Sequence, residues 1–352
     1  MIHIVPLVRL RHGVHMRYST LLLALFPQTA LAELPAPVTD ADYPPIVKQE
    51  AVLGRDLFYD PILSGNLNVA CATCHNPAFG TSDGLSLGIG DGGIGLGTSR
   101  VIDPENLPEA RVPRNSPALF NLGAYEFTRL FHDGRIEVDA DRPNGIRTPL
   151  ADDMVAGFAS LLSAQTMFPV LSPDEMAGHY AENDVSKAVR QGLLTGPGGA
   201  WDIIAKRVAA VPEYADRFAK AYPDRPEIAF TDIANALAAF MAWEWRSDTS
   251  LFDEVLRGQA TLEGPAAAGL ELFYGAAGCA ACHSGPFLTD QNFYAMGAPQ
   301  IGPGKAAAFE TNARDEGRFR VTGRAEDLYA FRTPSLRNVL ETGPYGHAGA
   351  QK

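Results

Sequence analysis

Cys71-Ala72-Thr73-Cys74-His75 and Cys279-Ala280-Ala281-Cys282-His283 are two copies of one pentapeptide, and together they contain all four cysteines of the chain. A Cys-x-x-Cys-His segment attaches c-type haem: the thiols form thioethers with the vinyl groups, and the histidine ligates the iron. Zinc sites and redox dithiols use the same residue types. A zinc site would need both histidines to point at a shared ion, and a dithiol would need no histidine after it. The repeat therefore favours two covalently bound c-type haems.

The composition is compatible with a large cofactor-containing protein. The chain has 352 residues, 34 glycines, 26 prolines and a formal net charge of −12. This length suffices for two domains, and the glycine and proline content is typical of long loops around a cofactor. The acidic balance argues against a nucleic-acid partner. It would attract a basic protein partner, and it serves equally well to keep a protein in solution.

Residues 1–32 have the pattern of a leader and signal peptide. Met16-Arg17 precedes an apolar run over residues 21–26, followed by Ala30-Leu31-Ala32, a small-x-small cleavage pattern. The run is too short to span a bilayer, so no integral membrane segment is expected. We expect translation to start at Met16 and the mature protein to be exported to the periplasm. With every cysteine committed to haem, no disulfide is expected.

Helical periodicity dominates the rest of the chain. Helices are predicted over residues 47–59, 153–162, 185–194, 201–211, 228–245 and 266–274, and no run of alternating residues predicts a strand. Each haem motif follows a predicted helix and leads into a glycine-rich loop, which makes an internal repeat. Residues 84–97 contain seven glycines; without a β-α-β context they predict a loop beside the first haem rather than a phosphate site. The fold class is mainly α, with a boundary near residues 246–262.

Several longer motifs resemble those of the bacterial di-haem cytochrome c peroxidase and MauG family. In chain order they are Leu57-Phe58-Tyr59-Asp60-Pro61-Ile62-Leu63-Ser64-Gly65, Arg114-Asn115-Ser116-Pro117, Phe131-His132-Asp133-Gly134-Arg135, Pro173-Asp174-Glu175-Met176 and Phe331-Arg332-Thr333-Pro334-Ser335-Leu336-Arg337-Asn338. The resemblance implies two cytochrome c-like domains, each built around one haem. It assigns residues 33–250 to an N-terminal domain with the peroxide-reactive haem. Residues 251–352 would form a C-terminal domain with the electron-transfer haem.

The resemblance implies catalytic residues on the open side of the first haem. Glu175 matches the carboxylate that acts as acid and base, although a glutamate after Pro-Asp is also common in the first turn of a helix. Gln165 and Pro169 match a MauG-type pocket, while Met176 is expected to pack. Many family peroxidases close this iron with a loop histidine. Between residues 76 and 131 this chain has no histidine, so we expect a first haem iron that is five-coordinate without prior reduction.

A second departure from the family lies between the haems. His132 occupies a possible inter-haem position at which the family usually has tryptophan, credited with relaying electrons. We expect His132 either to bond a propionate or to be a packed substitute. The three tryptophans of the chain, Trp201, Trp243 and Trp245, are expected in the core rather than in a relay.

The resemblance also implies ligands for the two haem irons and for a calcium ion. His75 and His283 would ligate the two irons, and the second iron's other ligand, methionine or tyrosine, would follow Pro344-Tyr345-Gly346-His347 by about fourteen residues. We therefore expect the chain to be a C-terminally truncated version of a longer protein. Met296 is expected to pack, and His347 to lie in a loop near the domain interface; His179, which matches no family position, is expected on the surface. An interdomain calcium would use the Asn115 side chain and the carbonyls of Thr342 and Pro344.

Three functions remain open on the sequence. The first is hydrogen peroxide reduction with electrons from a small cytochrome c or a cupredoxin. The second is a MauG-like oxidation of side chains in a partner protein. The third is a di-haem electron carrier, which would give Glu175 no role. A homodimer is possible, since family members are often dimers.

Overall fold

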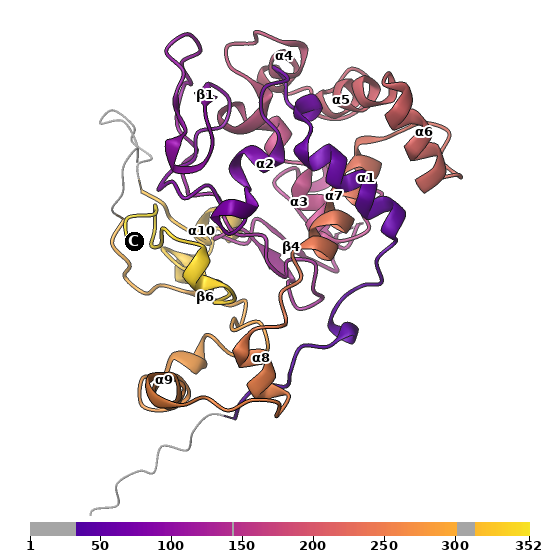
Figure 1. The fold of residues 1–352 in the computed structure, drawn as a ribbon. Coiled ribbons are helices and arrows are strands. Elements are labelled where there is room, and N and C mark those ends of the chain that lie inside the picture. The colour runs from indigo at the N-terminus through magenta and orange to yellow at the C-terminus, as the bar shows by residue number, and fades with distance from the viewer. Residues whose placement is uncertain (1–32, 143, 301–313) are drawn as a thin grey trace, which may run out of the picture.

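The structure, a computed structural model, describes residues 33–142, 144–300 and 314–352, and the predicted leader lies outside these residues. The described part is mostly helical, as predicted (Figure 1). Its α-helices are α1 (Lys48–Tyr59), α2 (Cys71–Cys74), α3 (Leu161–Thr166), α4 (Asp184–Arg190), α5 (Ala200–Ala209), α6 (Pro212–Ala221), α7 (Phe230–Glu244), α8 (Leu251–Leu256), α9 (Gly264–Tyr274) and α10 (Phe319–Thr322).

The strands in the same ranges are two or three residues long. They form three small antiparallel sheets: β1 (Gly93–Ile94) with β2 (Val101–Ile102), β3 (Arg129–Leu130) with β4 (Ile136–Val138) and β5 (Ile146–Arg147), and β6 (Phe293–Tyr294) with β7 (Phe331–Arg332). Strands this short have no room for the alternation that reveals a half-buried strand in a sequence. They were accordingly missed.

Helices α1 and α7 form the centre of the main core. A β-carbon added at Gly54 in α1 would lie 1.8 Å from the carbonyl oxygen of Ala236 in α7, so a glycine is what lets the two backbones meet. Next to this crossing, the Phe58 ring lies 5.4 Å from the Phe240 ring and 4.9 Å from that of Trp245. This aromatic cluster fixes the position of the segment that leads into the first haem motif.

The segment around the second haem motif contributes little to that core. The main hydrophobic cluster draws on residues between 38 and 245 and, from the later part of the described chain, on Phe287. Helices α8 and α9 lie at the periphery (Figure 1), and α9 buries only Tyr274. An ion pair of 2.7 Å between the buried Arg337 and Asp253 side chains ties the last family motif to α8.

One predicted helix was wrong over most of its length. Residues 153–162 were expected to be helical, but α3 begins at Leu161. Gly157 has a φ of 112°, which no helix tolerates, and the Ser160 side chain accepts a hydrogen bond of 3.1 Å from the Ser163 amide. Ser160 is thus the N-cap, a signal that the apolar periodicity upstream of it obscured.

The remaining predicted helices match α1, α4, α5, α7 and α9 to within a few residues. The boundary region, residues 246–262, itself contains α8. The division into cytochrome c-like domains at residues 250 and 251 stays a prediction. No helix of the described ranges is long and apolar enough to cross a membrane.

Candidate functional site

The first motif presents its histidine in the manner of an iron ligand. Cys71 and Cys74 are the first and last residues of α2, and His75 caps its C-terminus. Nδ1 of His75 lies 3.1 Å from the carbonyl oxygen of Thr81. A hydrogen bond from Nδ1 fixes the ring and leaves Nε2 as the ligating atom. Burial lowers the pKa of His75, which keeps the imidazole neutral, as metal binding requires.

The second motif repeats this arrangement. Nδ1 of His283 lies 3.0 Å from the carbonyl oxygen of Leu288, five residues further along. The acceptors in the two motifs, Thr81 and Leu288, both have left-handed backbones, with φ of 61° and 53°. A turn that few side chains adopt therefore recurs after both motifs. The internal repeat predicted from the sequence extends to backbone conformation.

A pocket joins the first motif to two of the predicted catalytic residues. Cys71, His75, Gln165 and Pro169 all line it. The other lining residues are mostly apolar: Phe58, Leu63, Leu119, Thr166, Val170, Met176, Leu237 and Met241. Met176 is 4 % exposed and packs, as expected. An apolar pocket with a histidine and a motif thiol at its wall fits a haem attached to this motif.

Glu175 lies beside this pocket rather than among its lining residues. It belongs to a single π-helical turn, Pro173–Ala177, next to Met176. Burial raises the pKa of Glu175 to about 7, while a hydrogen bond from the Ser172 side chain acts in the opposite direction. A carboxyl group with a pKa near neutrality can both accept and return a proton at physiological pH.

The glycine-rich loop packs against the backbone of Glu175. A β-carbon at Gly90 would lie 2.4 Å from the Glu175 carbonyl oxygen, which explains why the loop needs a glycine there. The next residue, Asp91, is fully buried, and its amide donates to the same carbonyl at 2.9 Å. Its carboxylate accepts hydrogen bonds from the side-chain amides of Asn66, Asn68 and Asn106. The loop is thereby anchored beside the predicted acid and base.

His132, at the predicted inter-haem position, lies in a cluster of charged residues. Its Nε2 is 3.6 Å from a carboxylate oxygen of Asp315, to which Arg114 also pairs. His347 approaches the same carboxylate at 3.1 Å. Burial, with help from the Arg114 charge, lowers the pKa of His132 to about 4, so the imidazole is neutral at pH 7. Sequence reasoning missed this cluster, because Asp315 and His347 belong to no common local motif.

The predicted calcium ligands are partly brought together. The Asn115 side-chain amide nitrogen lies 3.1 Å from the Pro344 carbonyl oxygen, and Thr342 precedes Pro344 by two residues. Turning the amide by half a turn would point its oxygen to the same place, an orientation that a hydrogen-bond network decides. The donor set of amide and carbonyl oxygens suits a hard cation. The calcium assignment stays a prediction.

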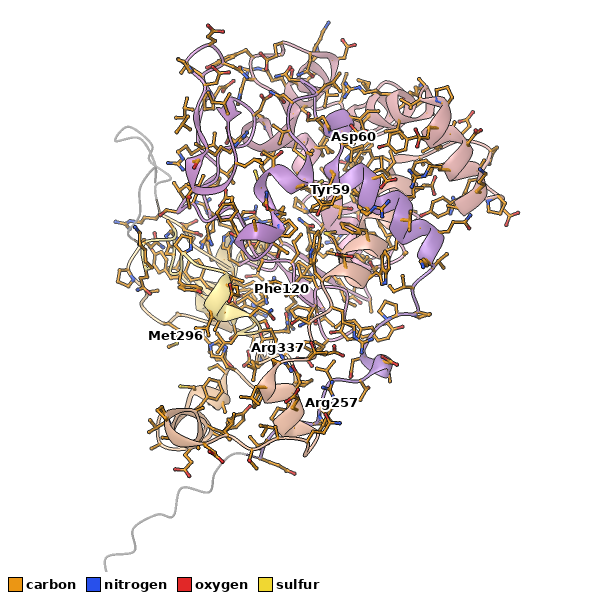
Figure 2. The ribbon with its side chains drawn as sticks, viewed as in Figure 1. Tyr59, Asp60, Phe120, Arg257, Met296 and Arg337 are labelled. Carbon is orange, nitrogen blue, oxygen red and sulfur yellow. The ribbon has the colours of Figure 1, made fainter. Side chains whose placement is uncertain are left out.

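Three expectations about single residues were wrong. His179 was expected on the surface but is 1 % exposed, with Nε2 3.4 Å from the Asp91 carbonyl oxygen. Met296 was expected to pack but is 78 % exposed at the edge of the molecule (Figure 2). Trp201 and Trp245 are buried as expected, whereas Trp243 is 40 % exposed because it lies on the outer face of α7.

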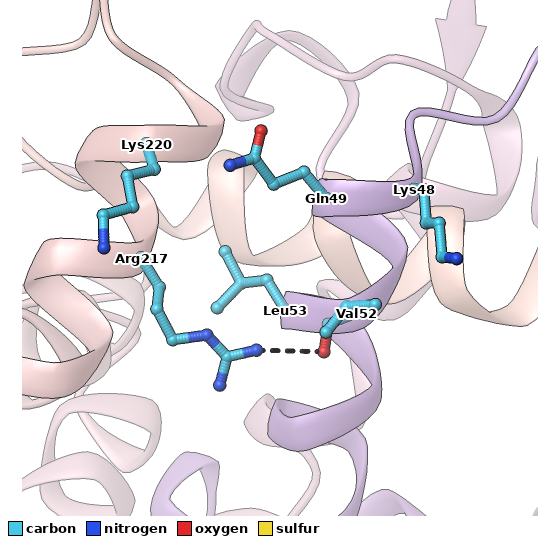
Figure 3. A pocket seen from close by; sticks show the side chains of 6 residues that line it. All are labelled: Lys48, Gln49, Val52, Leu53, Arg217 and Lys220. Carbon is cyan, nitrogen blue, oxygen red and sulfur yellow. Dashed lines mark hydrogen bonds between the residues drawn. The ribbon is translucent and has the colours of Figure 1, made fainter.

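Another hollow lies between α1 and α6 and carries no residue of either haem motif. Lys48, Gln49, Val52, Leu53, Arg217 and Lys220 line it (Figure 3). Arg217 donates to the Val52 carbonyl oxygen and pairs with Asp56, so its charge is already neutralised. The hollow contains none of the predicted site residues.

Comparison with known proteins finds a matching family model and several related sequences. A family described as di-haem cytochrome c peroxidase matches residues 48–261. Methylamine utilization protein MauG of Methylorubrum extorquens is 30 % identical over 308 residues, or 87 % of this chain and 66 % of its own length. Cytochrome c551 peroxidase of Pseudomonas aeruginosa is 30 % identical over 90 % of this chain and 72 % of its own.

A solved structure has the same fold. The crystal structure of a MauG-like protein associated with microbial copper homeostasis superimposes with a TM-score of 0.59 and 26 % identity, covering 93 % of this chain and 79 % of that one. The chain thus spans just under two thirds of the length of the MauG relative and somewhat more of the others. On the family match and the identities, the chain belongs to the di-haem cytochrome c peroxidase family.

Proposed function

We propose that the protein is a periplasmic peroxidase that reduces hydrogen peroxide to water, with electrons from a small cytochrome c or cupredoxin. The observation that carries the proposal is the meeting of Cys71 and His75 with Gln165 and Pro169 in one pocket, with Glu175 adjacent. Two covalently attached c-type haems are part of the proposal, held by Cys71, Cys74 and His75 and by Cys279, Cys282 and His283.

The haem on the first motif would supply the site at which peroxide is bound and its O–O bond is cleaved. Gln165 would orient peroxide by hydrogen bonding, and Pro169 would limit the space for other ligands. Glu175 would take a proton from one oxygen of peroxide and return it to the other, which departs as water. Two electrons and two protons complete the reduction of peroxide to two water molecules.

The second motif would serve electron transfer. The donor's electrons would enter through the haem on His283 and pass the region of His132 to the first haem. Calcium, bound by Asn115, Thr342 and Pro344, would hold the two parts in register. The neutral, partly buried imidazole of His132 is suited to packing between haems and would replace the usual tryptophan without its indole ring.

A MauG-like function is the second candidate. The absence of histidine between residues 76 and 131 favours it, because no loop histidine from that segment can close the first iron. In this version electrons would come from side chains of a partner protein. An oxidised protein whose first haem shows only low-spin absorption bands would contradict a five-coordinate first iron.

The decisive experiment compares the haem-loaded wild type with Glu175→Gln. We expect peroxide turnover with a reduced cytochrome c to fall by about 10²–10⁴-fold, the usual contribution of a general acid and base. Glu182→Gln is a matched control, since Glu182 belongs to the loop after Glu175 and bonds Asn66 and the His179 amide. Unchanged turnover in Glu175→Gln would show that the assignment of Glu175 is wrong, whereas a wild type without peroxide turnover would leave the electron-carrier function as the better explanation.

A further inference from the structure

Arg332 is a cation that pairs with no anion among the residues the structure describes. Its Nε donates to the Phe131 carbonyl oxygen at 2.9 Å, and one terminal nitrogen donates to the Thr333 carbonyl and the Gln291 side-chain oxygen, at 3.2 and 3.3 Å. All three acceptors are neutral. Burial, together with the nearby Arg129 charge, lowers the pKa of Arg332 to about 10. A buried charge is costly unless a countercharge is present.

The other arginines between residues 318 and 337 differ from Arg332 in this respect. Each forms an ion pair with a carboxylate: Arg318 with Glu137, Arg320 with Glu316, Arg324 with Asp327 and Arg337 with Asp253. No carboxylate of the described ranges pairs with Arg332. Its second terminal nitrogen has no hydrogen-bond acceptor there either.

A second polar group beside Arg332 also lacks its partner. Gln291 is 4 % exposed, and its side-chain nitrogen has no acceptor among the described residues. A buried donor left without an acceptor is rare in native proteins and points to a missing group. Two observations, a guanidinium without an anion and an amide donor without an acceptor, therefore meet at one place.

This place adjoins the second haem motif. Gln291 follows Leu288, whose carbonyl orients His283, by three residues. Asp290 donates from its amide to the Cys282 carbonyl at 2.9 Å, and the Thr333 carbonyl that accepts from Arg332 also accepts from Thr289 at 2.7 Å. On its other side, Arg332 contacts Phe131, the neighbour of His132. The position of the site therefore points to an anion that belongs to the cofactor bound at this motif.

We propose that Arg332 and Gln291 bind a haem propionate, that of the haem on Cys279, Cys282 and His283. Hydrogen bonds from a guanidinium to a carboxylate are short and strong, and the free terminal nitrogen of Arg332 has N–H groups to donate to one. The guanidinium would then help to set that haem's reduction potential through charge and hydrogen bonding. The proposal rests on the proposed haem attachment. A propionate of the first haem is also a carboxylate, and the test below distinguishes binding to one haem from binding to the other.

The test is a redox titration of the haem-loaded protein, with both haems followed separately by their absorption bands. Removing the positive charge favours the more positive, oxidised haem. In Arg332→Gln we expect the oxidation equilibrium of the His283 haem to shift at least about tenfold toward the oxidised form, which is 59 mV for one electron. Arg324→Gln removes an equal charge from an exposed, paired arginine nearby and is expected to shift neither haem.

Other readouts keep the outcomes distinct. The propionate bending bands in the resonance Raman spectrum should change in Arg332→Gln and also in Gln291→Leu, which removes the amide donor and leaves the charge. A shift confined to the His75 haem would overturn the assignment to the second haem, and unchanged potentials with unchanged bands would overturn the proposal altogether. Haem content per chain, measured on the wild type, tests whether two haems are attached at all. Failure of the haem attachment can therefore be told apart from failure of the propionate proposal.

Discussion

At the scale of the residue, the proton chemistry of Glu175 reflects burial and a hydrogen bond from one neighbour, Ser172. The Ser172 hydroxyl stabilises the charged carboxylate and so opposes the effect of burial on its pKa, which stands at about 7. Because a base must be deprotonated in the free enzyme, kcat/KM for peroxide is expected to fall as the pH drops through about 7. Ser172→Ala should move this fall to higher pH and leave the rate at high pH nearly unchanged. A pH profile of kcat/KM measures both effects, and a profile identical to that of the wild type would contradict the role of Ser172.

The same raised pKa has a consequence for stability. The folded protein holds the Glu175 proton more tightly than the unfolded chain, whose carboxyl titrates near its ordinary value of 4.5. The stabilisation is complete below that value and is lost as the pH rises through about 7. Glu175→Gln removes the cost of ionisation, so we expect it to raise the melting temperature relative to the wild type at pH 8 but not at pH 4. If the melting temperatures of the variant and the wild type differed equally at both pH values, ionisation of the buried Glu175 carboxyl would not be what destabilises the wild type.

How far residues could be assigned from the sequence depended on whether their signal was local. The haem ligands have a fixed spacing and needed no fold to be recognised. Gln165 and Pro169 were reached through resemblance, and the structure brings them to the predicted pocket. His179 and Asp91 carry no local signal, because their burial results from contacts between segments about 90 residues apart.

At the scale of the element, the crossing of α1 and α7 offers a matched pair of glycine substitutions. Gly54→Ala would push a β-carbon into the Ala236 backbone, which cannot yield like a side chain. We expect it to lower the free energy of unfolding by about 3 kcal/mol or more. Gly269 in α9 has open space at the same position, so Gly269→Ala should raise stability by about 0.4–1 kcal/mol. Urea unfolding of both variants measures the contrast, and equal effects would mean that the close approach of the helices does not matter.

Helices were predictable where an amphipathic pattern met a clear end. Helix α5 runs from Ala200 to Ala209, one residue from its predicted start, and its buried residues recur at helical spacing. The prediction over residues 153–162 was wrong because an apolar pattern continued through Gly157, whose backbone is left-handed. The short strands were missed for a different reason: their pairing is set by distant partners, such as Phe293 with Arg332, rather than by the strands' own residues.

At the scale of the whole molecule, the two haem motifs have unequal support from protein side chains. Around the first motif, residues of α1, α3 and α7 line the pocket and continue into the main core. Around the second, α9 leaves Leu272 56 % exposed and buries only Tyr274. A segment with so few buried apolar contacts gains its stability from something other than its own packing. A covalently attached haem, which supplies a large apolar surface, is what we infer for that role.

This asymmetry predicts different responses to losing each haem. In Cys279→Ala/Cys282→Ala we expect the amides of α9, residues 264–274, to exchange hydrogen at rates near those of an unfolded chain, while those of α7 keep their protection, because α7 belongs to the main hydrophobic core. In Cys71→Ala/Cys74→Ala we expect the opposite pattern, with weakened protection in α1, α3 and α7 around an empty apolar pocket. Hydrogen exchange followed by mass spectrometry resolves these segments. Full protection of residues 264–274 without the second haem would show that this segment folds on protein contacts alone.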